Sequence, residues 1–102
     1  MDRMVHSCHD NGNKYYEAWF KEDTTIYHKI DGPALQYWYS DGIINSQFYF
    51  IDGKHHRLDG PSYISYDESG VTISKEYWIN GEEIDCSSDE EFKKIVKLLS
   101  FK

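Results

Sequence analysis

The chain contains an internal repeat, which constrains its fold more than any other feature of the sequence. The tripeptide Asp-Gly-Pro at 31–33 returns at 59–61, displaced by 28 residues, and the glycines of two later turns return with the same displacement. When 27–54 is laid over 55–82, nine positions are identical and no gap is needed. A repeat of this period indicates units that bury apolar surface by stacking on their neighbours. Such arrays commonly present a binding surface, so the repeat favours a binding protein over an enzyme.

A partial earlier copy precedes these two. Gly12 stands seven residues before Trp19, the interval that also separates Gly42 from Tyr49. Two extra residues within 22–26 break the register, and this copy lacks Asp-Gly-Pro. We therefore expect about two and a half repeats of 28 residues.

Each copy alternates turn residues with segments rich in β-forming residues. Asp-Gly-Pro should bend the chain, because glycine adopts positive φ easily and proline fixes φ. Asp52-Gly53 and Asn80-Gly81 are typical of type I′ hairpin turns. The expected extended segments are 16–20, 33–39, 43–51, 54–58, 61–66 and 71–79. Sequence neighbours should then be sheet neighbours, in an antiparallel meander.

The last part of the chain changes character and predicts a helix over about 89–100. Ser-x-x-Glu capping boxes occur at Ser87/Glu90 and Ser88/Glu91. An apolar stripe with helical spacing follows, formed by Phe92, Ile95, Val96 and Leu99. We expect this stripe to pack on the sheet of the same chain, and packing on a second subunit in a homodimer is the alternative.

The length of 102 residues suits one domain with one modest core. We expect a mainly β (α+β) fold with a flexible N-terminus at 1–12, a meander of β-repeats at 13–85 and a C-terminal helical part at 86–102. Rings should supply much of the buried surface, since aromatic residues make up 17% of the chain.

Charge excludes some classes of partner. Eighteen acidic and eleven basic residues give a formal net charge of -7, which opposes binding to nucleic acid and favours a basic protein partner. No apolar run reaches the length of a membrane span and none resembles a signal segment, so we expect a cytosolic protein without membrane contact. Cys8 and Cys86 are then expected to be reduced thiols.

The two full copies carry a recognisable motif, His-Lys-Ile-Asp-Gly-Pro-Ala at 28–34 and His-Arg-Leu-Asp-Gly-Pro-Ser at 56–62. They resemble the His-x-x-Asp-Gly-Pro-Ala repeats of small bacteriophage and giant-virus proteins, which are similar to the MORN-like repeats of YwqK-type antitoxins. The resemblance covers about 27–82 and implies a β-repeat fold with a binding role. It supplies no catalytic residues.

The residues that carry reactive groups give little support to catalysis or to a cofactor. His28 and His56 are equivalent in the repeat and suggest either a catalytic pair or side chains that bond to a turn. We favour the second, because no nucleophile accompanies them. His6, Cys8 and His9 invite zinc, but the cluster lacks paired ligand spacing. We therefore expect no catalytic residue, metal or other cofactor.

Two groups of residues are candidates for contact with a partner. The rings of Trp38, Tyr39 and Tyr49 are of the types that dominate binding hot spots, although ring-on-ring packing within the sheet is the more ordinary explanation. The acids Glu82, Glu83, Asp85, Asp89 and Glu90 form a dense negative cluster that can steer a basic partner. Acids also complement the start of a helix, so part of this cluster has a structural explanation.

These observations lead to three functional hypotheses. The first is a non-enzymatic acidic binding protein, a viral accessory factor that inhibits or sequesters a host protein of defence or nucleic-acid processing. The second is an antitoxin or immunity protein for a cognate toxin. The third is a small hydrolase or nucleotide-binding pocket that uses His28 and His56.

Overall fold

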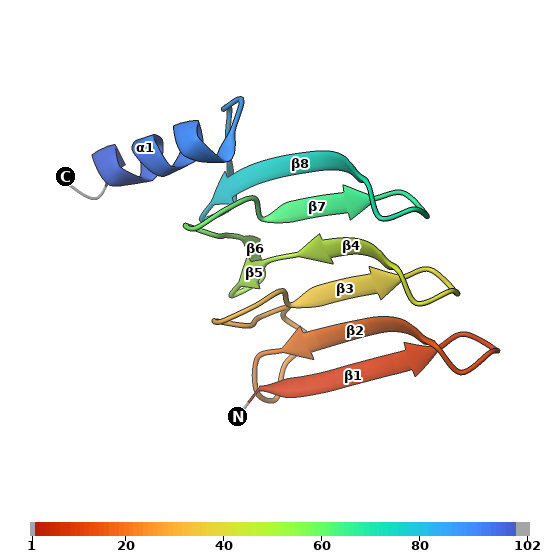
Figure 1. The fold of residues 1–102 in the computed structure, drawn as a ribbon. Coiled ribbons are helices and arrows are strands. Elements are labelled where there is room, and N and C mark those ends of the chain that lie inside the picture. The colour runs from red at the N-terminus through yellow and green to blue at the C-terminus, as the bar shows by residue number, and fades with distance from the viewer. Residues whose placement is uncertain (1, 100–102) are drawn as a thin grey trace.

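The computed structural model describes residues 2–99 and shows one antiparallel meander that ends in a helix (Figure 1). Seven strands form the main sheet in the order β1-β2-β3-β4-β7-β8-β9, and β5 pairs with β6 in a short separate ribbon. The elements are β1 (Arg3–Cys8), β2 (Lys14–Phe20), β3 (Leu35–Trp38), β4 (Ile44–Phe48), β5 (Phe50–Ile51), β6 (Lys54–His55), β7 (Tyr63–Tyr66), β8 (Thr72–Ile79), β9 (Glu82–Ile84) and α1 (Asp89–Leu99). The predicted mainly β meander with one C-terminal helix is confirmed.

The sheet is a single layer. The molecule measures 49 × 36 × 16 Å. Two sheets packed face to face lie about 10 Å apart, and the side chains on their outer faces would make such a molecule thicker still. Few apolar side chains are fully enclosed in residues 2–99. The buried ones are Ala18, Ala34, Leu35, Pro61, Tyr77 and Phe92. Contacts between rows of neighbouring side chains, together with the backbone ladders, therefore hold most of the fold.

The type I′ turns are formed as predicted. Asp52 and Gly53 have φ of 51° and 80°, and Asn80 and Gly81 have φ of 49° and 82°. Positive φ at both central residues defines this turn and matches the twist of the strands that it joins. Each hairpin therefore has its register fixed by its own sequence.

The expectation of a flexible segment at 1–12 is wrong for 3–8, because Arg3–Cys8 form β1 and pair with β2. Val5 lies opposite Ala18 in this pairing. The following turn is also held, since His9 Nε2 donates to Trp38 O at 2.9 Å. The meander therefore begins at Arg3, while residue 1 lies outside the described residues.

The segment 43–51, predicted as one strand, is divided at Tyr49 into β4 and β5. Tyr49 N donates to Ser62 O at 2.7 Å, whereas Tyr49 O accepts from His56 N at 3.1 Å. The chain bends here, because β4 stays in the main sheet and β5 pairs with β6. The equivalent segment 71–79 forms the unbroken strand β8 from Thr72 onwards.

Of the two predicted caps, α1 begins with the one at Ser88/Glu91, and the prediction for Ser87/Glu90 is wrong because Ser87 bonds to Glu91. Ser88 Oγ accepts from Glu91 N at 3.1 Å, and the Glu91 carboxylate accepts from Ser87 Oγ at 2.6 Å. Phe92 is fully buried and packs against Tyr77, with ring centroids 4.8 Å apart. Leu99 is 43% exposed, so the expectation that it packs on the sheet is wrong.

The helix was predicted to reach residue 100, which lies outside the described part. Among residues 2–99, no helix has the length and apolar character needed to cross a membrane.

Candidate binding surface

The register of the strands sorts the side chains onto two different faces. Leu35 lies opposite Ala18 on one side and Phe48 on the other, and Phe48 lies opposite Tyr63. Because alternate residues of a strand share a face, the neighbours two positions away belong to the same face. We call this the aromatic face, formed by Val5, Tyr16, Ala18, Phe20, Leu35, Tyr37, Phe48 and Tyr63.

A column of rings runs along one side of the aromatic face. Phe20 stacks on Tyr27 and Tyr27 on Phe50, each pair with centroids 5.2 Å apart. His55 continues the column, 4.5 Å from Phe50 and 5.0 Å from Trp78. Burial lowers the pKa of His55, which favours the neutral ring that such a stack accommodates. The column links the hairpin turns of successive copies.

The opposite face carries a network of polar side chains, and we call it the polar face. Gln47 Nε2 donates to Gln36 Oε1 at 2.9 Å, and the hydroxyl of Tyr66 donates to Gln47 Oε1 at 2.9 Å. Trp19 Nε1 donates to Glu17 Oε1 at 2.9 Å. Polar groups on this face thus satisfy one another across the strands.

The predicted ring anchors are all engaged within the chain. Lys14 Nζ lies 5.3 Å from the ring centroid of Trp38, and the hydroxyl of Tyr39 donates to Tyr66 O at 2.7 Å. Trp38 and Tyr39 lie at the end of the sheet opposite to the one where β8 ends (Figure 1). The structure therefore does not bring these two rings together with the acidic cluster.

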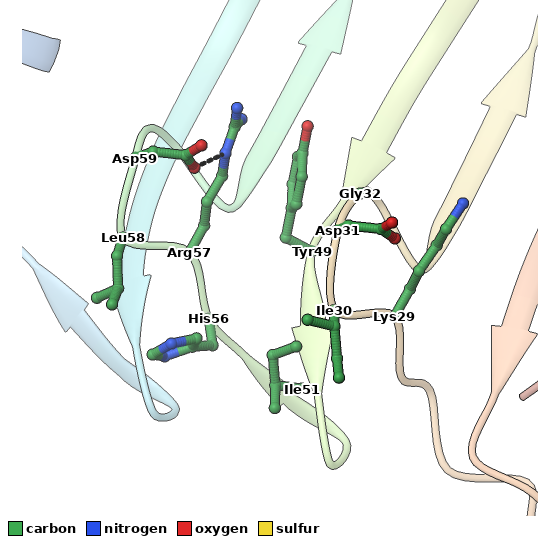
Figure 2. Close-up of a pocket in the computed structure, with 10 residues that line it drawn as sticks. All are labelled: Lys29, Ile30, Asp31, Gly32, Tyr49, Ile51, His56, Arg57, Leu58 and Asp59. Carbon is green, nitrogen blue, oxygen red and sulfur yellow. Dashed lines mark hydrogen bonds and ion pairs between the residues drawn. The ribbon is translucent and has the colours of Figure 1, made fainter. Parts of the chain in front are cut away.

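Tyr49 stands in a groove of about 640 Å³ between the two Asp-Gly-Pro loops. Figure 2 shows its ring between Arg57 on one side and Asp31 and Lys29 on the other. Arg57 Cζ lies 4.1 Å from the centroid of this ring, and Arg57 Nε donates to Asp59 Oδ1 at 2.7 Å. This hydrogen bond is the largest cause of the lowered pKa of Asp59. The Arg57 cation therefore holds the seam between two copies.

His28 and His56 bond to hairpin turns in the same way. His28 Nδ1 accepts from the backbone N–H of Asp52 at 2.9 Å, and His56 Nδ1 accepts from that of Asn80 at 3.0 Å. A turn amide that would otherwise need water is thereby satisfied from the neighbouring loop. This geometry agrees with the interpretation of both histidines as turn-bonding side chains.

The acidic cluster divides into engaged and unengaged carboxylates. Asp89 accepts from the hydroxyl of Tyr77, and burial together with this hydrogen bond raises the pKa of Tyr77. The side chains of the other four predicted acids form no hydrogen bond or ion pair with another described residue. These four are Glu82 and Glu83 on β9, Asp85 in the following loop, and Glu90 in the first turn of α1. We call them the acidic edge.

Residues 2–99 contain no group of three or more potential ligands that could hold a metal ion. Cys8 and Cys86 are free thiols. Burial and the nearby carboxylates raise the pKa of Cys86, which disfavours the reactive thiolate.

Comparisons of the chain with models of protein families, with curated proteins and with solved structures found no match. The functional assignment therefore depends on the geometry described above. Sequence reasoning missed the aromatic face, because rings occur on both faces and the alternation that separates them is not visible in a run such as 48–50.

Proposed function

We propose that this protein is a non-enzymatic binding protein that docks on a basic surface of a protein partner. The observation that supports this is the acidic edge, whose four carboxylates lie between Glu82 and Glu90 in the chain and form no ion pair with a described residue. Concentrated like charges steer and orient a partner of opposite charge. The formal net charge of -7 acts in the same direction over longer distances.

The motifs at 28–34 and 56–62 resemble viral repeats, and on this basis we propose a partner in the host cytosol. A host protein of defence or nucleic-acid processing has a basic cleft that receives phosphates. An acidic protein is attracted to such a cleft while it is repelled by the nucleic acid itself. The protein would thus inhibit or sequester its partner by occupying the cleft.

Two alternatives are separated from this proposal by simple observations. An antitoxin would use the same acidic edge against a toxin, and affinity capture from the native host identifies which protein binds. A hydrolase site at these residues would use an imidazole nitrogen as a proton acceptor, whereas Nδ1 of His28 and of His56 each already accept a turn amide, which leaves the proton of the neutral ring on Nε2. This engagement supports a structural role for both histidines.

The test is surface plasmon resonance with the captured partner at ionic strengths from about 0.05 to 0.5 M. The variant Glu82→Lys/Glu83→Lys should associate more slowly than the wild type and with a flatter salt dependence. The control Asp10→Lys/Glu68→Lys changes the net charge equally in exposed turns far from the acidic edge, and it should have a smaller effect. An association rate equal in both variants would overturn the role of the acidic edge.

A further inference from the structure

The outer edge of β8 is vacant at a position that is filled in the other copies. β3 pairs with β2, and β7 pairs with β4, so the second long strand of a copy receives the first long strand of the next. β8 is the equivalent of β2 and β4, and its outer neighbour is the short β9, which pairs only with 77–79. In the described chain, 72–76 has β7 on one side and no strand on the other.

The backbone of this edge has unused donors and acceptors. Ser62 N donates to Glu76 O at 2.8 Å, so the peptide groups of Glu76 face β7. Because alternate residues of a strand bond to opposite sides, Lys75 directs its N–H and C=O groups outward. Ile73 is the extra residue of the β-bulge that β8 forms with β7, so its N–H does not follow this alternation. On β4 the corresponding outward side is occupied, since Tyr49 N donates to Ser62 O. The outward backbone groups of β8 therefore correspond to those of β4, but in the described chain no strand pairs with them.

The side chains at this edge give less protection against added strands than those of β9. Val71 and Ile73 are 60% and 63% exposed. Natural edges are commonly blunted by charge, by proline or by short length. β9 has two of these devices, being three residues long with two glutamates, whereas 71–76 is longer and has three β-branched residues besides Lys75 and Glu76.

The helix α1 leaves this edge open. Asp89 contacts the Tyr77 hydroxyl and lies 3.8 Å from Lys75 Nζ, and both of these side chains belong to the polar face. Phe92 packs against Tyr77 from the same side. The start of α1 thus covers the polar face at the end of β8, and β8 is the outermost long strand of the sheet (Figure 1).

We propose that the β8 edge receives an extended segment of the protein partner as an added antiparallel strand. This inference rests on the proposed function and specifies how the partner is recognised. β3 and β7 both begin at the end of the sheet where β8 ends, so the added strand would begin beside Glu82, Glu83 and Asp85. The partner segment is therefore extended and rich in β-branched residues, with basic residues directly before it.

The experiment uses a synthetic peptide, Lys-Arg-Lys-Gly-Thr-Val-Thr-Val-Thr, titrated into the full chain and followed by amide NMR and calorimetry. Lys75→Pro removes one outward N–H and keeps the bonds to β7, a replacement that edge strands tolerate. Lys75→Thr keeps the N–H, removes the same side-chain charge and is the matched control. Binding should be about tenfold weaker in Lys75→Pro than in Lys75→Thr, the loss expected for one main-chain hydrogen bond.

Peptides that carry N-methyl groups on alternate residues test the ladder without changing the protein. The pattern that blocks the residues facing β8 should abolish binding, and the opposite pattern should preserve it. Equal binding of both peptides, or of Lys75→Thr and Lys75→Pro, would overturn the proposal. If Lys75→Pro instead abolishes concentration-dependent self-association in sedimentation, the edge receives a second copy and the proposal is also overturned. Slower association of Glu82→Lys/Glu83→Lys with the captured partner would sustain the proposed function even then.

Discussion

The two full copies of the repeat differ in what covers one equivalent ring. In the first copy, Tyr49 lies beneath Arg57, which comes from the next Asp-Gly-Pro loop. In the second copy, no such loop follows, and Phe92 of α1 packs against Tyr77 instead. The helix therefore acts as a cap that replaces a cation from a further copy with a buried ring. Repeat arrays require such caps where the stacking ends.

The hairpin turns of the two copies also differ, although their backbone angles agree. Asp52 accepts from Lys21 Nζ at 2.6 Å and lies near His28, while the equivalent Asn80 has no charge to offer. The space around the glycine is also tighter in the first turn than in the second. The same turn thus forms in different surroundings. Variants of the two turns can therefore separate the need for positive φ, which they share, from the effect of the neighbouring side chains, which differ.

The largest expected difference concerns the caps over the two rings. Phe92→Ala should lower the free energy of unfolding by about 3–5 kcal/mol, because it empties a fully buried site. Arg57→Ala should cost only about 1–2 kcal/mol, since it removes a partly exposed cation–π contact and hydrogen bonds to Asp59 and to Pro61 O. Urea unfolding measures both. Leu98→Ala, 69% exposed on the same helix, is the control, and an equal loss there would contradict the cap.

The next comparison concerns the turn glycines. Gly53→Val and Gly81→Val should each cost about 1–3 kcal/mol, because a β-branched residue is strained at positive φ. Gly53→Val should cost more, since an added Cβ would lie 3.0 Å from Ile26 Cγ2, whereas at Gly81 the nearest atom is Lys54 Cδ at 3.6 Å.

Thermal and urea unfolding of both variants rank these costs. Gly32→Ala is the control, because Gly32 does not have positive φ and its added Cβ would make only ordinary contacts. A larger loss at Gly81 than at Gly53 would show that local crowding does not set the difference.

The smallest expected effect is a dependence on pH at the hairpin turn of the first copy, which the equivalent turn at Asn80 lacks. The hydrogen bond from Lys21 is the main cause that lowers the pKa of Asp52 below 3.8 in the folded protein. Because the folded pKa lies below the unfolded one, this carboxylate stabilises the fold above the unfolded pKa and loses that contribution as the pH falls through the folded value.

Asp52→Asn should therefore be less stable than the wild type at about pH 6, and the difference should decrease as the pH falls below about 3.9, the ordinary pKa of an aspartate. Urea unfolding at about pH 6 and at successively more acid pH values measures this difference. Asp10→Asn removes an exposed carboxylate that has no ion pair among the described residues, and it serves as the control. A difference that persists unchanged into acid would exclude the Lys21 contact as its cause.

Local rules made much of this fold predictable from the sequence. Asp52-Gly53 and Asn80-Gly81 form their turns because the required angles depend on the residues themselves. The cap at Ser88 and Glu91 likewise depends on neighbours in the chain. Such features place the strands of the meander and the start of the helix.

Features that depend on distant partners were not predictable in the same way. Arg3–Cys8 have no turn or repeat signal, and they form β1 only because β2 offers an edge. The engaged and unengaged acids look alike in the sequence, and only the position of Tyr77 reveals that Asp89 is occupied. The vacancy beside β8 is also invisible until the pairing of the earlier strands is known.

The single-layer sheet has a mechanical consequence. The chain enters at β1 and leaves beyond β8, at opposite sides of the sheet (Figure 1). A force that pulls these two ends apart acts across the strands, so the hydrogen bonds of one ladder open in succession rather than together. No second layer is present in residues 2–99 to share the load. The sheet should therefore unzip strand by strand at low force, and each strand that is removed exposes the next edge.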